Sequence, residues 1–153
     1  MKILISNMSE EDLPYVLDIE TKCFSRPWTE KMFLFELERN KVSRVYTAKL
    51  EEKSNLVCGY ICIWLFPGEA QIINLAVNPE YQGQGIGKQL IEFALDKIAC
   101  ERIDEVFLEV RASNMPALTL YEKAGFLKIG RRKKYYSDTG EDAFLMKKSI
   151  LIN

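Results

Sequence analysis

The spacing of apolar and polar residues over the first forty positions predicts one strand and two helices. Residues 2–7 are expected to form the strand. Ser9 and the three acids after it open the first helix, which ends near Phe24, because carboxylates are favoured at the positive end of a helix dipole. Thr29 opens the second helix, whose apolar residues recur with helical spacing. The segment from Ser25 to Trp28 joins the two helices.

Three β-rich runs follow, Val42 to Leu50, Leu56 to Phe66 and Ala70 to Val77. Charged or Pro-Gly turns separate them, as in antiparallel hairpins. The pattern therefore predicts a three-stranded meander.

The second half of the chain alternates between helix and strand. Gln84 to Cys100 has the most regular helical face, and Glu105 to Arg111 returns to strand. Asn114 to Ala124 predicts a short helix, and Phe126 to Tyr136 with Ala143 to Ile152 predict a closing hairpin. The order is that of a mixed α/β fold with a strand-loop-helix-strand unit in its middle.

Length and composition favour one globular domain over residues 1–153. A single core can grow until roughly 250 to 300 residues, and no linker or repeat interrupts this sequence. The apolar fraction is 48% and the charged fraction is 28%, as in an average globular protein. The net charge of -1 gives too weak a field to attract the whole protein to nucleic acid or to an anionic membrane. Any charged partner must therefore be recognised locally.

The chain contains no histidine, which excludes Ser-His-Asp and Cys-His nucleophile pairs and nearly every type of zinc site. We expect no metal, and a general base must be a carboxylate, Lys, Tyr, Cys or the chain terminus. The longest apolar run, Tyr60 to Phe66, is far shorter than the roughly 20 residues of a membrane helix, so we expect a cytoplasmic protein. The cysteines lack Cys-x-x-Cys spacing, and we expect reduced, buried thiols. They are Cys23, Cys58, Cys62 and Cys100.

The segment from Gln82 to Lys88 contains three glycines at alternate positions, between the last strand of the meander and the longest helix. Glycines allow tight turns, and amides at a helix start face outward with the positive end of the dipole behind them. Such a loop can hold a pyrophosphate, although a flexible turn has the same composition. The segment matches neither the P-loop pattern nor the first turn of a Rossmann unit.

These residues resemble the GNAT family of N-acetyltransferases, whose acetyl-CoA loop reads Gln/Arg-x-x-Gly-x-Gly/Ala. Gln82, Gly85 and Gly87 match that pattern. A later family block, Asn-x-x-Ala-x-x-x-Tyr-x-x-x-Gly-Phe, is matched by Asn114, Ala117, Tyr121, Gly125 and Phe126. The resemblance implies a mixed, mostly antiparallel sheet flanked by helices, with acetyl-CoA as co-substrate.

Within the family, several segments are similar to the RimI group, which acetylates the N-terminal alanine of a ribosomal protein. They are residues 108–114, the loop at Pro27-Trp28, and Tyr135-Tyr136 followed by Glu141-Asp142-Ala143. The similarity implies a protein N-terminus as acceptor, possibly in a small-subunit ribosomal protein, with Trp28 and Tyr136 beside the peptide. From the sequence alone, Trp28 could equally be a loop anchor packed on the core. Met115-Pro116 departs from the small residues usual at that point and affects the helix start and the neighbouring acceptor groove.

Two residues are candidates for proton transfer. The resemblance assigns the general base to Glu109, a carboxylate inside an otherwise apolar strand, where it is costly unless paired, hydrogen-bonded or functional. A salt bridge to Arg111 or Arg102 is the alternative for Glu109. The resemblance assigns the general acid to Tyr121, which could equally be a core aromatic.

The remaining implied site residues hold the cofactor. In the family, main-chain groups of the strand before the loop pair with the pantetheine amides as an added strand would. Asn114 shares a helix face with Tyr121 and would follow the cofactor arm. The implied cofactor-binding residues are Leu75, Ala76, Val77, Gln82, Gly83, Gln84, Gly85, Ile86, Gly87, Lys88 and Asn114.

Other functions remain open at this point. The same chemistry could act on a small amine or on lysine, because the family reuses one cofactor site with many acceptor loops. The fold could also serve as a non-catalytic CoA-binding module. The basic stretch from Arg131 to Tyr136 has the residue types of a nucleic-acid surface, but in a protein of pI 5.7 we expect a solvated strand and no direct nucleic-acid contact. The sequence leaves the oligomeric state and the acceptor's identity open.

Overall fold

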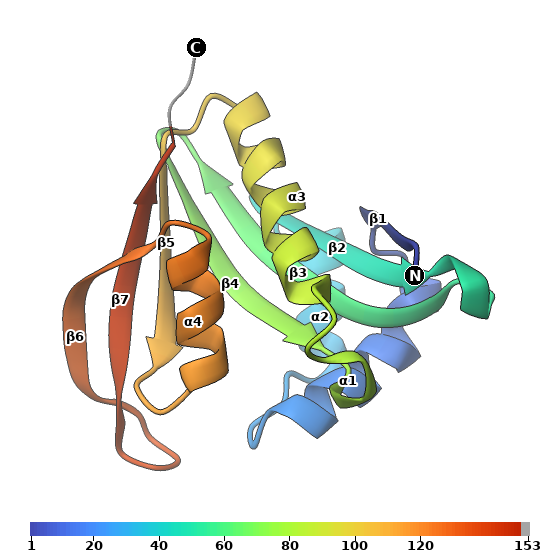
Figure 1. Cartoon of the computed structure of the whole chain (residues 1–153), viewed down its shortest axis with the longest axis horizontal. Coiled ribbons are helices and arrows are strands. Elements are labelled where there is room, and N and C mark those ends of the chain that lie inside the picture. Colours follow the sequence, from blue (N-terminus) through green and yellow to red (C-terminus); the bar gives the residue numbers. More distant parts are fainter. Residues whose placement is uncertain (151–153) are drawn as a thin grey trace.

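The computed structural model describes residues 1–150 and contains one seven-stranded sheet, ordered β1-β2-β3-β4-β5-β7-β6 (Figure 1). The strands are β1 (Ile3–Asn7), β2 (Ser43–Leu50), β3 (Leu56–Phe66), β4 (Glu69–Val77), β5 (Glu105–Arg111), β6 (Leu127–Tyr136) and β7 (Glu141–Ser149). The helices are α1 (Leu13–Cys23), α2 (Glu30–Glu38), α3 (Ile86–Cys100) and α4 (Met115–Lys123). Every strand predicted from the sequence is present, and the mixed, mostly antiparallel fold is confirmed.

The one parallel pair of strands lies in the middle of the sheet, between β4 and β5. Their register pairs join Ala70–Ile72 to Val106–Leu108 and extend no further. Beyond these pairs the two strands diverge toward the carboxyl end of each, as Figure 1 shows. The sheet is therefore split between the carboxyl ends of β4 and β5, the two strands that the glycine loop and α3 connect.

The closing hairpin of β6 and β7 is antiparallel, as predicted, but β7 lies between β5 and β6. β7 pairs with β5 from Glu105 to Arg111, which makes β5 an interior strand. The sequence placed the last strand at 143–152, whereas β7 begins at Glu141 and ends at Ser149. Residues 151 and 152 of that prediction lie outside the described residues.

The helices cover both faces of the sheet and bury a separate apolar cluster on each. On one face α3 and α4 lie over β3 to β5, in front of the sheet in Figure 1. On the other face α1 and α2 cover β2 to β4. Residues of β5 alternate between the faces: Val106, Leu108 and Val110 belong to the first cluster, so Glu109 lies on the face of α1 and α2.

Local capping chemistry explains where the first two helices begin. Ser9 precedes a short 3₁₀ turn, Glu10–Asp12, and its amide donates to Asp12 Oδ2 at 3.0 Å. The α-helix starts only at Leu13, because this turn takes the first positions of the helix predicted from Ser9. Thr29 is the N-cap of α2 and its Oγ1 accepts from the Met32 amide at 3.3 Å, as the sequence predicted.

All four cysteines are free thiols. Cys58 and Cys62 are buried in β3 and Cys23 is half-buried, but Cys100 is exposed. The prediction of a buried thiol is wrong for Cys100, because it lies two residues beyond Ile98 and therefore on the solvent side of α3. Within residues 1–150, no helix is long and apolar enough to cross a membrane, and His, Cys, Asp and Glu form no cluster of metal-ligand type.

Candidate active site

A cavity of about 710 Å³ lies on the face of α3 and α4, where β4 leaves β5. Leu75–Val77 of β4 form one wall, and their other backbone edge pairs with β3. Beyond Ile72 no residue of β4 pairs with β5, so one edge of these residues is available to a ligand. The end of α1 and one side of α4 along its length also line the cavity.

The glycine loop closes one end of this cavity. Gly83 and Gly85 have φ angles of 77° and 83°, a left-handed conformation that favours glycine. Gly85 is the N-cap of α3, and no side chain in the described part of the chain caps that helix start, so its first amides are free to bind an anion. Gln82 holds the loop against β4, since its Nε2 donates to the Val77 carbonyl at 3.0 Å.

Helix α4 brings two of the predicted site residues to the same cavity. Asn114 lines the cavity and caps α4, with Oδ1 accepting from the Ala117 amide at 3.2 Å. Tyr121 lies seven residues further along and is only 7% exposed. Burial raises the pKa of its phenol well above the ordinary range, so Tyr121 remains protonated at neutral pH. The helix also packs close to the glycine loop, because a Cβ at Gly87 would lie 3.0 Å from Leu120.

Glu109 is the first residue of β5 after the last register pair with β4. It lines a second cavity, of about 520 Å³, on the face of α1 and α2. Its Oε1 lies 3.3 Å from Arg132 Nε, so Glu109 does form an ion pair. The alternative weighed from the sequence named the wrong partners, Arg111 or Arg102, because β7 pairs with both β5 and β6 and so brings Arg132 across to Glu109.

The second oxygen of Glu109, Oε2, is buried and has no hydrogen-bond partner among the described residues. The Tyr135 hydroxyl faces the carboxylate closely enough to raise the pKa of Tyr135, although it makes no well-formed hydrogen bond to Oε2. A buried carboxylate oxygen without a donor is energetically costly. This oxygen is therefore suited to accept a proton or a hydrogen bond from a ligand.

The two aromatic residues proposed for the acceptor entrance lie in different surroundings. Tyr136 lines the cavity of Glu109, and burial raises its pKa to about 12. Trp28 packs on Phe33 with ring centroids 5.1 Å apart and is partly buried in the core cluster under α1 and α2. Trp28 lines neither of the two cavities described above, and its contacts fit a loop anchor.

Sequence reasoning missed two residues near Glu109 and, elsewhere, one buried carboxylate. Arg132 and Tyr135 belong to the basic stretch that was interpreted as a solvated strand, and β6 is indeed exposed up to Tyr135, whereas Tyr136 is half-buried. The alternation of basic and aromatic residues marked the stretch, but nothing in it indicated contact with Glu109. Glu20, which is buried at 1% exposure, was also missed because helix acids are usually solvent-exposed.

A sequence model of the Acetyltransferase (GNAT) family matches residues 13–126. The chain belongs to the GNAT family of acetyltransferases. A Bacillus subtilis protein provisionally named as a ribosomal protein bS18-alanine N-acetyltransferase is 40% identical to this GNAT chain over 145 residues, covering 95% of this chain and 94% of the relative. The Escherichia coli K12 enzyme named ribosomal protein bS18-alanine N-acetyltransferase is 35% identical over 144 residues, covering 93% and 94%.

Solved structures agree with the family assignment. The E. coli ribosomal-protein-S18-alanine N-acetyltransferase has a TM-score of 0.88 to this GNAT chain at 31% identity, covering 99% of this chain and 96% of the other. The NatC complex bound to Gag peptide and CoA has a TM-score of 0.87 at 28% identity, covering 99% and 100%. This GNAT protein is an acetyl-CoA-dependent N-acetyltransferase.

The cavity on the α3 and α4 face has the features that acetyl-CoA requires. The uncapped start of α3 presents amides to a diphosphate, and an added Cβ at Gly83 or Gly85 would meet open space. The free edge of β4 at Leu75–Val77 can pair with an amide-containing arm. The residues of this GNAT chain thus fit the co-substrate that its family uses.

Proposed function

We propose that this protein acetylates the N-terminal α-amino group of a protein, with Glu109 as the general base and Tyr121 as the general acid. The observation that carries the proposal is Oε2 of Glu109, buried beside the point where β4 and β5 separate and without a hydrogen-bond partner within residues 1–150. A proton acceptor at this position can take the proton from an acceptor amine that approaches on the face of the sheet covered by α1 and α2. The relatives named as bS18-alanine N-acetyltransferases support a ribosomal protein with N-terminal alanine as the acceptor.

The chemistry suits a carboxylate base. An α-amino group has a pKa of about 7.7 to 8.0, so a fraction of the acceptor is neutral at physiological pH and the proton to be removed is not strongly held. Arg132 pairs with Oε1 and leaves Oε2 to receive this proton, directly or through one water.

Tyr121 has the properties of the proton donor. Acetyl-CoA supplies the acetyl group as a thioester, which an amine attacks directly. Burial keeps the Tyr121 phenol protonated until negative charge develops on a sulfur beside it. Glu109 lies on the face of α1 and α2, and Tyr121 lies on the opposite face, so base and acid would act from the two sides of the split in the sheet.

Acetyl-CoA would be held mainly by backbone groups. The amides at Gly83–Lys88 would bind the diphosphate, with Gln82 fixing the loop to β4. The edge of Leu75–Val77 would pair with the pantetheine arm, and Asn114 would line its path. Because these contacts use main-chain atoms, side-chain substitutions that preserve the backbone leave this binding largely intact.

An acetylation assay by intact mass spectrometry tests the proposal. The purified protein is incubated with acetyl-CoA and a panel of acceptors: a bS18 N-terminal peptide that begins with alanine, the same peptide with a blocked N-terminus and an internal lysine, and a polyamine. Acetylation of the free N-terminus alone supports the proposal. Acetylation of the lysine or the polyamine instead would assign another acceptor, and tight CoA binding without any product would indicate a non-catalytic module.

Substitutions then test the two assigned roles. Glu109→Gln and Tyr121→Phe are each expected to lower kcat about 100-fold or more, the usual contribution of a positioned acid or base, while leaving the calorimetric affinity for CoA near the wild-type value. Glu105→Gln is the matched control, because Glu105 lies on the same strand and pairs with Lys147 at 2.8 Å on the surface. Unchanged kcat in both Glu109→Gln and Tyr121→Phe would refute the mechanism without refuting the fold.

A further inference from the structure

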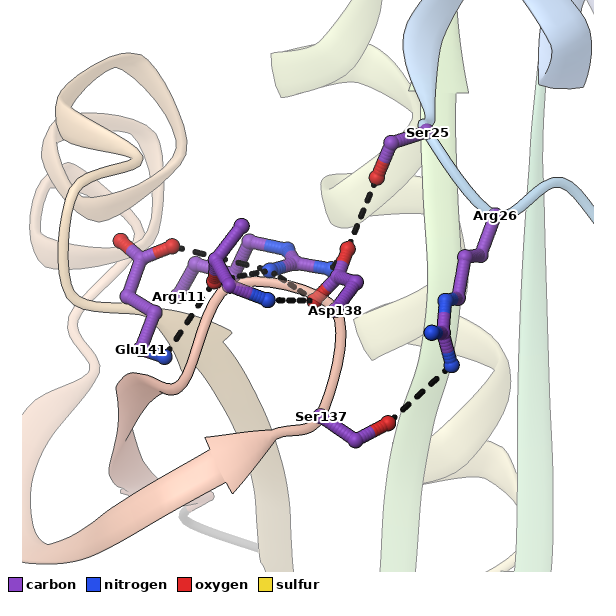
Figure 2. Close-up of polar contacts among 7 residues, drawn as sticks. Ser25, Arg26, Arg111, Ser137, Asp138 and Glu141 are labelled. Atoms are coloured by element: carbon purple, nitrogen blue, oxygen red, sulfur yellow. Dashed lines mark hydrogen bonds and ion pairs between the residues drawn. The ribbon is translucent and has the colours of Figure 1, made fainter.

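A chain of hydrogen bonds links two segments that are far apart in the sequence, as Figure 2 shows. Asp138, in the turn between β6 and β7, accepts from both terminal nitrogens of Arg111, at 3.0 and 2.8 Å. The same carboxylate accepts from the hydroxyl of Ser25, in the segment between α1 and α2, at 2.8 Å. Beside it, Arg26 Nη1 donates to Ser137 Oγ at 3.1 Å.

The contacts cross the split in the sheet. Ser25 and Arg26 follow α1, which packs on β3 and β4, whereas Arg111 ends β5 on the other side of the split. The backbone hydrogen bonds between β4 and β5 stop at the pair of Ile72 with Leu108. On the face of α1 and α2, side chains therefore join the two halves of the sheet three residues beyond the last backbone pair, at its open end.

Arg111 and Asp138 form a rigid centre for this link. The Arg111 guanidinium also lies 4.0 Å from the ring centroid of Tyr136 and 3.6 Å from a Glu141 oxygen. Hydrogen bonds from Arg111 and then Ser25 hold the pKa of Asp138 far below its usual range. The Asp138 side chain is only 12% exposed, so solvent competes weakly for its contacts. Planar two-bond pairs of this kind fix orientation as well as distance.

The link lies beside the candidate acceptor site. Arg111 is two residues from Glu109 and on the same face of β5. Tyr136, which lines the cavity of Glu109, immediately precedes the turn that contains Asp138. Ser25 lies two residues after Cys23, the last residue of α1, and Cys23 lines the cofactor cavity. One polar link thus connects the segment after α1 with the turn after Tyr136, the two segments that would flank the acceptor opening.

We propose that Ser25 and Asp138, held by Arg111, are positioning residues that fix the width of the acceptor opening and preorganise its two walls for a protein N-terminus. The inference rests on the proposed function and adds the residues that order the acceptor side. Without the link, the segment 24–28 and the turn 137–140 must be ordered when the acceptor binds, and the entropy of that ordering weakens acceptor binding. The glycine loop and the edge of Leu75–Val77, which would hold acetyl-CoA, lie outside both segments, so the affinity for CoA alone should change little.

The test compares Ser25→Ala with Ser25→Thr, which retains the hydroxyl. Ser25→Ala is expected to raise KM for the alanine-starting bS18 peptide ~3- to 10-fold with kcat within about twofold, the effect of losing one hydrogen bond of typical net strength. Calorimetry with CoA present should show the same loss in peptide affinity, while the affinity for CoA alone stays at the wild-type value. Ser25→Thr should restore KM and peptide affinity.

Arg131→Ala is the matched control, because it removes an ion pair with Asp142 of 2.6 Å that stays within the hairpin of β6 and β7. Hydrogen exchange gives a readout that needs no acceptor: Ser25→Ala should speed exchange in both 24–28 and 137–140, and Arg131→Ala should leave segment 24–28 unchanged.

The possible outcomes separate the inference about the link from the proposed acetyltransferase function. Unchanged exchange in segment 137–140 on Ser25→Ala, or unchanged KM and peptide affinity, would overturn the inference. A kcat loss with unchanged KM would also overturn it, since the link would then act on the chemical step. If the wild-type protein acetylates no peptide, the proposed function fails, and the exchange experiment still decides whether the link couples the two segments.

Discussion

Glu20 is a buried carboxylate whose only hydrogen-bond donors among the described residues are uncharged. The Trp28 amide donates to Oε2 at 2.7 Å, and Asn74 Nδ2 donates to Oε1 at 2.6 Å. The Tyr60 hydroxyl also donates to Oε1. Burial, and then the charge of Glu20, raise the pKa of Tyr60 far above its ordinary value. One side chain of α1 thus fixes the Trp28 segment, β3 and β4 to one another.

We predict that Glu20→Ala lowers the free energy of unfolding by about 2–4 kcal/mol, since it leaves buried donors unpaired and opens a cavity. The loss stays below the sum of three charged hydrogen bonds, because Asn74 Nδ2 also donates to the Tyr60 oxygen at 3.0 Å. Glu20→Gln should cost about 1–2 kcal/mol, because its carbonyl can replace Oε1 but its amino group cannot accept from the Trp28 amide.

Urea denaturation measures these differences, and hydrogen exchange at Trp28 identifies the bond that Glu20→Gln removes. Asp18→Asn is the matched control, since Asp18 is exposed and pairs on the helix surface with Lys22, and it should leave stability unchanged within error. A Glu20→Ala loss below about 1 kcal/mol, or a Glu20→Gln loss as large as that of Glu20→Ala, would refute the reasoning.

Two further predictions concern the thiols and the glycine loop. At pH 8 a thiol reagent should label Cys100 quickly, whereas Cys58 and Cys62 should react only after unfolding, because burial raises their pKa to about 11 and about 12; intact-mass spectrometry counts the labels. The folded protein holds these two thiol protons more tightly than the unfolded chain does. Their contribution to the free energy of unfolding is therefore fully present below the ordinary thiol pKa of about 8.5, and it is lost as pH rises through the pKa values of the folded state. Gly85→Ala should lower stability by about 1–2 kcal/mol and weaken CoA binding, because a left-handed φ is costly for alanine. Gly87→Ala gains helix propensity but brings a Cβ to 3.0 Å from Leu120, so the two effects oppose each other and the free energy of unfolding should change by less than about 1 kcal/mol.

Much of the site could be predicted from sequence because its signals are local. The glycines at 83, 85 and 87, the cap at Asn114 and the strand that contains Glu109 each depend on residues within a few positions of one another. Backbone geometry and helix capping act over that range, so the strands of the meander and the starts of α2 and α4 were predicted to within two residues. The roles proposed for Glu109 and Tyr121 rest on family resemblance as well as on this local pattern.

The sequence by itself determined the elements, the mixed fold and the position of the glycine loop. Only the tertiary structure decided that β7 lies between β5 and β6, which gives Glu109 the partner Arg132. It also decided that Ser25 meets Asp138, 113 positions away. Periodicity records which face of an element is buried, but it does not record which strand is the neighbour. Contacts between distant residues depend on strand order and on the divergence of β4 from β5, which the chain reaches only when it packs as a whole.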